Sequence, residues 1–212
     1  MKATKHQVEC LGVVLAGGLS SRMGENKAML RRNNTSMLSF SKNLLLQCGV
    51  DQIVVSGGLS LSQENNLGLN AEIMPDKIEH AGPVGGIYSV LQQCNPKALL
   101  ILPVDLPLMT ADALNKLKTT GELSQKASYF DDHHIPLYLP NNAFLGMFLS
   151  KAFTTLTENM GDSSQKNAPS IKKMLLQVPH LSIKSPQVKT LFNSNTPTQW
   201  QEAQRLFNLN SV

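Results

Sequence analysis

Short apolar runs alternate along this chain with longer stretches in which apolar residues recur at helical spacing. The short runs predict β-strands at 11–16, 52–56, 71–74, 98–102, 127–130, 135–139, 180–184 and 189–192. The longer stretches predict α-helices at 36–47, 83–93, 111–118, 142–156, 170–176 and 198–208. Strands that alternate with helices are typical of an α/β fold with a mainly parallel sheet. The run 98–102 is apolar throughout, which predicts a strand at the centre of that sheet.

Polar stretches interrupt this pattern without dividing the chain. We expect 59–69 to form a loose helix or loop, and 160–169 to form a mobile loop because it is rich in Gly, Asp, Ser, Asn and Lys. A chain of 212 residues suits one α/β domain, so we expect a single domain over 1–212 with an irregular leader at 1–9.

A glycine-rich turn follows the first predicted strand and is the strongest chemical signal in the chain. Residues 15–27 read LAGGLSSRMGENK. Glycines let the backbone approach a phosphate, and the backbone N–H groups of such a loop form an anion site. Arg22 and Lys27 supply positive charge for the same phosphates. The turn therefore predicts a nucleoside triphosphate site of neither the Walker nor the dinucleotide type. The alternative is an ordinary corner between a strand and a helix.

Three polar side chains follow predicted strands, at the edge where α/β sheets bind ligands. Asp105 lies between Pro103 and Pro107 after the central strand, and a rigid carboxylate there suits Mg²⁺. Its alternative is a turn or helix-cap aspartate. Asp76 follows Pro75, and because Pro-Asp is a common turn pair, a structural role in a turn is an equally strong interpretation. Asn195 can offer an oxygen to a metal or an amide to a phosphate, but it can also be a helix N-cap, with Thr196 or Thr198 as rivals.

Composition narrows the class of ligand and the compartment. The chain has 19 Lys+Arg against 15 Asp+Glu, a weak positive balance that suits anionic substrates. Basic runs are absent and aromatic residues are few, so we expect no nucleic acid as a partner. Cys10, Cys48 and Cys94 have no metal-binding spacing and are expected to be reduced thiols. With no apolar targeting or membrane segment in the sequence, we expect a cytoplasmic protein that does not engage a membrane.

Residues 15–30 resemble the signature LAGGxSxRMGxxKxxL of the MobA-like nucleotidyltransferase family, which includes molybdenum cofactor guanylyltransferases. Further elements resemble the family in the expected order: P-x-D-x-P at 103–107, the element at Asp76 and 81–87, and N-x-N-T-P at 193–197. The resemblance implies a three-layer, Rossmann-like nucleotidyltransferase fold over 1–212. It implies Arg22, Lys27 and Asp105 as catalytic residues, with Asp105 holding Mg²⁺. The nucleotide-binding residues that it implies are Leu15, Ala16, Gly17, Gly18, Lys27, Ser56, Asp76, Asp105 and Asn195.

By this resemblance the protein transfers GMP from GTP to Mo-molybdopterin, with Mg²⁺, and releases pyrophosphate. The pair Gly17-Gly18 resembles the guanine-using branch of the family. A molybdenum-inserting enzyme and apo-molybdoenzymes are the partners that the family implies. Two residues depart from the family pattern: Asn26 replaces an aspartate, and Ser56 replaces an asparagine that contacts the base. The alternatives are therefore a cytidylyltransferase acting on molybdopterin or another phosphorylated acceptor, and a nucleotide-binding accessory protein with weakened catalysis.

One local match to the family is poor. His133, His134 and Pro136 only loosely resemble a His-Pro segment of the family, because Ile135 stands where the proline belongs. We expect these histidines to lie in a surface turn.

Overall fold

The computed structural model describes residues 7–17, 26–57, 72–78, 81–158 and 169–209. The expected loops at 59–69 and, apart from its last residue, at 160–169 lie outside these ranges. Within the described part of the chain, no helix is both long enough and apolar enough to cross a membrane.

The strands and helices follow the predicted order closely. The strands are β1 (Cys10–Leu15), β2 (Arg31–Arg32), β3 (Thr35–Ser36), β4 (Gln52–Ser56), β5 (Glu72–Met74), β6 (Ala98–Pro103), β7 (Ala127–Phe130), β8 (His133–Pro140) and β9 (His180–Ile183). The helices are α1 (Met37–Gln47), α3 (Gly82–Cys94), α4 (Ala111–Ser124), α5 (Ala143–Glu158), α6 (Ile171–Leu175) and α7 (Pro197–Leu209), with 3-10 turns η1 (Lys27–Met29) and η2 (Val188–Leu191).

The main sheet has seven strands in the order β5-β4-β1-β6-β8-β7-β9. Strand β1 pairs in parallel with β4 and β6, β4 with β5, and β7 with β9. Only β8 runs against its neighbours, β6 and β7, in this sheet. The mainly parallel sheet is therefore confirmed, and β6 occupies its centre as its continuous apolar sequence predicted.

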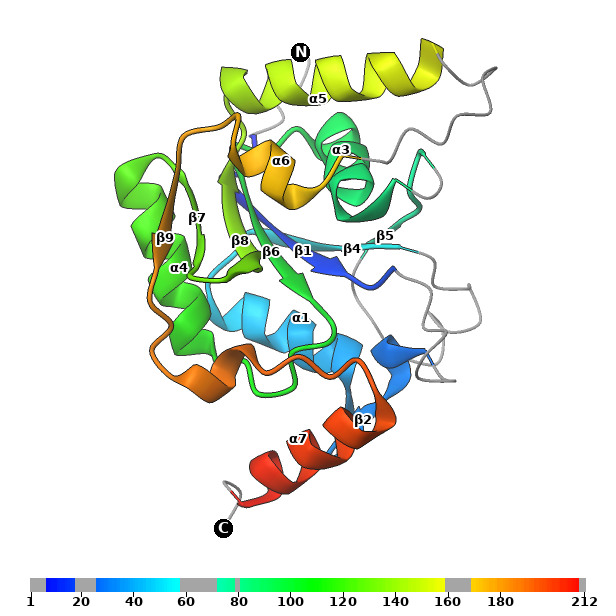
Figure 1. Ribbon diagram of the computed structural model, residues 1–212, viewed down its shortest axis with the longest axis vertical. Helices are drawn as coiled ribbons and strands as arrows, with labels where there is room; N and C mark the ends of the chain where they lie inside the picture. Colours follow the sequence, from blue (N-terminus) through cyan, green and yellow to red (C-terminus); the bar gives the residue numbers. More distant parts are fainter. Residues whose placement is uncertain (1–6, 18–25, 58–71, 79–80, 159–168, 210–212) are drawn as a thin grey trace, which may run out of the picture.

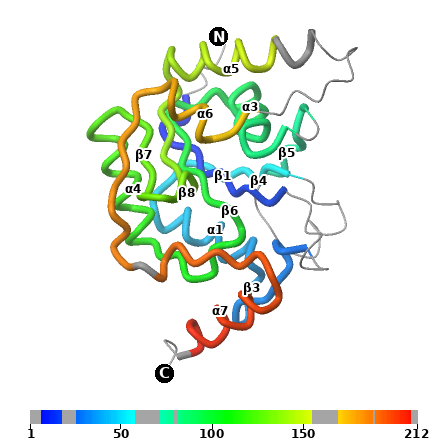
Figure 2. Tube along the Cα trace, in the orientation of Figure 1, coloured from blue at the N-terminus to red at the C-terminus, as the bar shows by residue number. Residues whose placement is uncertain are grey.

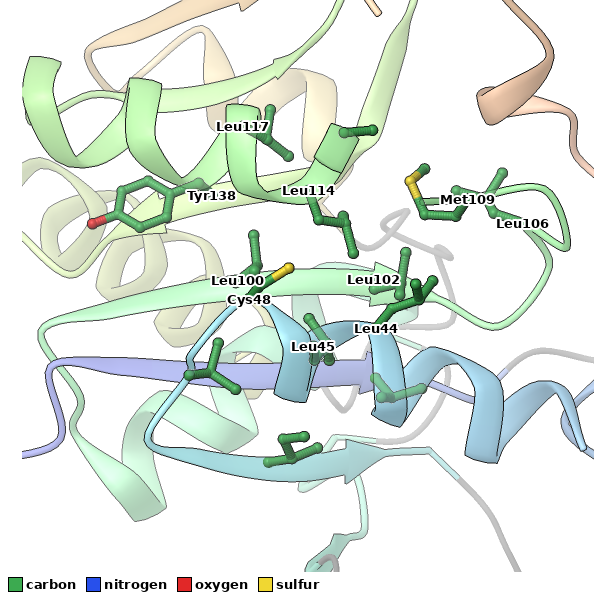
Figure 3. Packing of buried hydrophobic residues seen from close by; sticks show 14 of the residues in the cluster. Leu44, Leu45, Cys48, Leu100, Leu102, Leu106, Met109, Leu114, Leu117 and Tyr138 are labelled. Atoms are coloured by element: carbon green, nitrogen blue, oxygen red, sulfur yellow. The ribbon is translucent and has the colours of Figure 1, made fainter. Parts of the chain in front are cut away.

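Helices cover both faces of the sheet, so the molecule has three layers (Figure 1). Helices α1 and α4 pack on one face, and Figure 3 shows Leu45 of α1 and Leu114 of α4 beside Leu100 of β6. Helices α3, α5 and α6 pack on the other face. The alternating side chains of β6 feed both cores, because Leu100 and Leu102 belong to one cluster and Leu99 and Ile101 to the other. This is the expected three-layer architecture.

A smaller cluster holds the C-terminal helix. Figure 2 shows α7 beside the hairpin of β2 and β3, at the bottom of the view. Trp200, Ala203 and Phe207 of α7 are buried against Met37, the first residue of α1. The apolar pattern did not predict this hairpin, because strands of two residues are too short to show a periodicity.

Three predicted segments differ from the structure. Helix α4 continues past 118 to Ser124, although Thr119, Thr120 and Gly121 are poor helix formers. The helix gains from packing there, since an added Cβ at Gly121 would lie 2.0 Å from Cδ1 of the buried Tyr138.

The other two differences concern local backbone type. Residues 188–191 form the 3-10 turn η2 rather than a strand, because no neighbouring strand pairs with them in the described sheet. His133 and His134 lie in β8 rather than in a surface turn. The pairing of Phe130 with His133 extends the strand to the tight Asp131-Asp132 turn.

Candidate active site

The carboxyl ends of β1, β4, β5 and β6 meet at one edge of the sheet, because these strands are parallel. The register aligns Leu15 of β1 with Ser56 of β4 and with Pro103 of β6, and aligns Ser56 with Met74 of β5. The segments after these strands therefore start side by side. They carry most of the residues that the sequence singled out, which places the predicted site at this edge.

Two glycines bring the ends of β1 and β4 into direct backbone contact. Gly57 has φ +115°, and a Cβ added there would lie 2.2 Å from the backbone nitrogen of Gly17. The N–H of Ala16 donates to the carbonyl of Ser56 at 2.8 Å, which aligns the two chains just before this contact. Gly17 is exposed where the glycine-rich turn begins. Gly18 and Arg22 lie outside the described residues.

Leu15 and Ala16 contribute backbone hydrogen bonds at this edge of the sheet, while their side chains pack into the two cores. The Leu15 side chain is buried in the core, and its carbonyl accepts a hydrogen bond from Val104 N–H at 3.2 Å. Ala16 packs partly buried against the opposite core. These contacts fix the starting point of the glycine-rich turn relative to the Asp105 segment.

Lys27, Asp105 and Asn195 form a cluster assembled from three distant segments. The Lys27 Nζ atom lies 3.5 Å from Asp105 Oδ2 and donates to Asn195 Oδ1. The Lys27 and Asp105 side chains are only 19% and 20% exposed, so their attraction is less screened than that of a surface pair. The structure thus brings together three of the predicted residues.

Asn26 holds Lys27 in this cluster by capping the 3-10 turn. Its Oδ1 atom accepts a hydrogen bond from the N–H of Ala28 at 3.0 Å. An amide oxygen makes this bond as well as a carboxylate oxygen does, because only an acceptor is needed. Asn26 therefore makes the capping contact that the aspartate implied by the resemblance could also make.

Asp105 is held rigidly and has one free oxygen. Its backbone carbonyl accepts hydrogen bonds from Ser194, at 3.0 Å from N–H and 3.3 Å from Oγ. The Oδ1 atom of Asp105 is buried and has no hydrogen-bond partner in the described part of the chain. Burying a carboxylate oxygen without a partner is costly, so this atom is suited to an incoming ligand.

The donor set fits a hard divalent cation. Asp105 offers a carboxylate and Asn195 an amide oxygen, both of which Mg²⁺ accepts. No group of three or more His, Cys, Asp or Glu side chains that could hold a metal occurs among the residues described. Mg²⁺ commonly uses one or two protein carboxylates and takes its other ligands from substrate phosphates and water. The residues present match that pattern.

Ser56 and Asp76 form a second pair on the β4 and β5 side of the site. The Ser56 hydroxyl donates to Asp76 Oδ1 at 3.1 Å, and Ser56 is only 3% exposed. Helix α3 closes over this pair, since a Cβ added at Gly86 would lie 2.3 Å from Ser56 Oγ and 3.4 Å from Asp76 Oδ1. In this arrangement the Ser56 hydroxyl orients Asp76.

Asn195 is not the N-cap of α7. Thr196 fills that position: its Oγ1 accepts from the N–H of Gln199 at 3.2 Å, while Gln199 Oε1 accepts from the N–H of Thr196 at 3.1 Å. This reciprocal arrangement is a capping box. The pattern Thr-x-x-Gln at 196–199 could have revealed it in the sequence. The Asn195 side chain is left available for Lys27.

Arg32 is a supporting residue that the sequence analysis missed. Its Nε atom donates to the carbonyl of Pro107 at 2.8 Å, which ties down the segment that carries Asp105. The guanidinium carbon lies 4.2 Å from the ring centre of Phe40 and 5.0 Å from that of Phe207. Burial lowers the pKa of Arg32. No local pattern could reveal these contacts, because the partners come from α1, α7 and the segment after β6.

The cluster of Lys27, Asp105 and Asn195 at the carboxyl edge of a mainly parallel sheet is typical of a nucleotide-binding enzyme of the α/β class. The family model of the MobA-like NTP transferase domain matches residues 12–164. The chain therefore belongs to the MobA-like NTP transferase family and is a nucleotidyltransferase, as the resemblance implied.

Curated relatives agree with this membership. A molybdenum cofactor guanylyltransferase of Xanthomonas euvesicatoria pv. vesicatoria is 33% identical over 190 residues, which cover 89% of this chain and 91% of the relative. A probable molybdenum cofactor guanylyltransferase of Nostoc sp. is 25% identical over 186 residues, which cover 87% of this chain and 86% of the relative.

Solved structures share the fold. Molybdopterin-guanine dinucleotide biosynthesis protein A from Archaeoglobus fulgidus superposes with a TM-score of 0.71 at 18% identity, covering 94% of this chain and 99% of its own. The 2-C-methyl-D-erythritol 4-phosphate cytidylyltransferase from Thermus thermophilus superposes with a TM-score of 0.65 at 12% identity, covering 92% and 98%. The Rossmann-like nucleotidyltransferase fold is thereby confirmed.

Proposed function

We propose that the protein transfers GMP from GTP to Mo-molybdopterin, forming the molybdopterin guanine dinucleotide cofactor and pyrophosphate in a Mg²⁺-dependent reaction. The observation that carries the proposal is the cluster of Lys27, Asp105 and Asn195, whose lysine is the last residue of the glycine-rich segment 15–27. The names of the relatives, together with family membership, support the choice of GTP and molybdopterin. On this proposal the whole chain acts as one cytoplasmic NTP transferase domain.

The reaction needs little from the protein beyond charge neutralisation and alignment. A phosphate oxygen of the acceptor forms a bond to the α-phosphorus of GTP as the bond to the β-phosphate oxygen breaks, and the electron pair leaves with pyrophosphate. No general base is required, because the acceptor phosphate is already ionised at neutral pH. Arg22 and Lys27 offset the negative charge of the triphosphate, and the backbone at Gly17 and Gly18 supplies donors and space.

Asp105 and Asn195 would hold the metal ion on this proposal. When bound, Mg²⁺ neutralises phosphate charge and polarises the α-phosphoryl group. Ser194 and Arg32 keep Asp105 in place through their hydrogen bonds to the backbone of its segment. Ser56 holds Asp76, a proposed nucleotide-binding residue, through its hydrogen bond to Oδ1. A molybdenum-inserting enzyme and apo-molybdoenzymes are the protein partners that the family resemblance implies.

Nucleotide choice is tested by thermal unfolding with GTP, CTP, ATP or UTP in the presence of Mg²⁺. We expect GTP to raise the melting temperature most, because binding to the native state stabilises it. Larger stabilisation by CTP would replace the guanylyl assignment with the cytidylyl alternative.

Catalytic competence is tested by pyrophosphate release with GTP and Mo-molybdopterin. We expect turnover by the wild-type protein and its loss in Lys27→Ala. If the wild-type protein bound GTP but released no pyrophosphate, the accessory-protein alternative would hold. Turnover that survived in Lys27→Ala would contradict the role of Lys27.

A further inference from the structure

Asn195 lies in a connection without regular structure between η2 and α7, so its position depends on individual hydrogen bonds. Ser194 is fixed by its two bonds to the carbonyl of Asp105. On the other side, Gln199 reaches back from the first turn of α7. Its Oε1 atom accepts hydrogen bonds from the N–H of Asn195 at 2.8 Å and of Thr196 at 3.1 Å.

We propose that Gln199 is a positioning residue for the active site and acts through Asn195. A capping box needs only the bond to Thr196, so the shorter bond to Asn195 goes beyond the needs of the helix. By holding the N–H of Asn195, Gln199 restricts the backbone that aims Oδ1 of Asn195 at Lys27. The inference rests on the proposed function, in which Asn195 and Asp105 hold the metal.

Helix α7, which carries Gln199, is anchored by buried side chains, so the contact between Gln199 and Asn195 is held rigidly. The next residue, Trp200, is only 8% exposed and packs with Met37 of α1. The N–H of Trp200 also donates to the carbonyl of Thr196 at 2.9 Å, which closes the first turn. Gln199 therefore connects the core under α7 to a side chain of the metal site, and the contact preorganises that side chain.

The chemistry of the contact predicts which substitutions are tolerated. Both hydrogen bonds use the side-chain oxygen as acceptor, so a glutamate of the same length retains them. Alanine removes both bonds and leaves the N–H of Asn195 without its partner. Gln201, exposed on the same helix, provides a matched control of the same residue type.

The test measures Mn²⁺ binding by electron paramagnetic resonance, with GTP present and well below the melting temperature of each variant. We expect Gln199→Ala to weaken Mn²⁺ binding roughly tenfold, the typical loss of metal affinity when a residue that supports a metal ligand is removed. We expect Gln199→Glu to stay within about twofold of the wild-type protein, because its side-chain oxygen can accept the same two hydrogen bonds. We expect Gln201→Ala to bind Mn²⁺ as the wild type does.

A double-mutant cycle separates positioning from a general loss of stability. If Gln199 acts through Asn195, Gln199→Ala has no further effect on Mn²⁺ binding in an Asn195→Ala background. An equal loss in both backgrounds, or a lower melting temperature with unchanged Mn²⁺ affinity, would overturn the inference alone. Absence of Mn²⁺ binding by the wild-type protein would instead overturn the proposed function and this inference with it.

Discussion

At the scale of the residue, Lys27 lies where a metal ion would be expected. Its ammonium group contacts both Asp105 and Asn195, the side chains that offer oxygen ligands. The same lysine is proposed to bind the triphosphate. Lys27 must therefore exchange its contacts with Asp105 and Asn195 for contacts with phosphate when the metal and nucleotide bind together.

We predict that Lys27→Met moves two affinities in opposite directions. Binding of Mn²⁺ to the nucleotide-free protein becomes tighter, because the competing ammonium is gone and Asp105 is left without its counter-charge. Binding of Mg²⁺-GTP becomes at least about tenfold weaker, since a hydrogen bond to a charged group contributes on the order of 1.5–3 kcal/mol.

Electron paramagnetic resonance measures the first affinity and calorimetric titration the second. Lys126→Met, at an exposed position before β7, serves as the control for removing one positive charge. If both affinities of Lys27→Met fell together, the idea that Lys27 competes with the metal would be wrong.

At the scale of the element, α4 shows how tertiary packing can outweigh the low helix propensity of one residue. Gly121 lies directly against the ring of Tyr138, which is only 5% exposed and belongs to the core between α4 and the sheet. Figure 3 shows Tyr138 at one end of the labelled residues of this core, which also include Leu117 of α4. The close approach explains how a residue of low helix propensity can stabilise this helix in its tertiary setting.

We predict that Gly121→Ala lowers the free energy of unfolding by about 1–3 kcal/mol, because overpacking displaces the buried ring. The matched variant is Gly146→Ala in α5, where an added Cβ meets no atom within 4 Å. Alanine is the better helix former, so Gly146→Ala raises the free energy of unfolding by up to about 1 kcal/mol. Urea unfolding measures both, and a shift of the same sign in the two variants would contradict the packing argument.

At the scale of the whole molecule, two buried thiols link stability to pH. Burial raises the pKa of Cys10 to about 12 and that of Cys48 to about 11, from an ordinary value of 9.0. The Cys48 thiol also donates to the carbonyl of Ala111 at 3.7 Å, which requires its proton. Both thiols lie in the core beneath α1 and α4.

We predict that the protein loses stability as pH rises above about 9, because the unfolded chain then releases thiol protons that the native state retains. The stabilisation is complete below pH 9.0 and declines through the interval up to about 11 for Cys48 and about 12 for Cys10. Each thiol contributes a slope of at most about 1.4 kcal/mol per pH unit.

Urea unfolding at about pH 8, 9 and 10 measures how steeply the free energy of unfolding falls with pH. The double variant Cys10→Ala/Cys48→Ala is expected to be less stable but less sensitive to pH in this interval. Burial also raises the pKa of Tyr138, so part of the slope remains in the variant. An unchanged slope would show that the thiols are not responsible.

The sequence by itself determined the order of elements and the edge that carries the chemistry. Periodicity reports which positions are buried, and β1, β4, β6 and α3 therefore lie where the apolar spacing predicted them. Local chemistry also marked Lys27, Asp105 and Asn195 as candidates, and family motifs predicted the fold. These are properties of short segments, which a single sequence displays directly.

Only the tertiary structure decided which candidates meet. Lys27 is 78 residues from Asp105 and 168 residues from Asn195, and their contact depends on strand order and on the path of the chain into α7. The antiparallel pairing of β8 and the hydrogen bond from Arg32 to the carbonyl of Pro107 likewise depend on partners distant in sequence. The hydrogen bond between Gln199 and the N–H of Asn195 depends on the backbone geometry at the start of α7. A local pattern reports the preference of a segment, whereas a site is made by the packing that brings segments together.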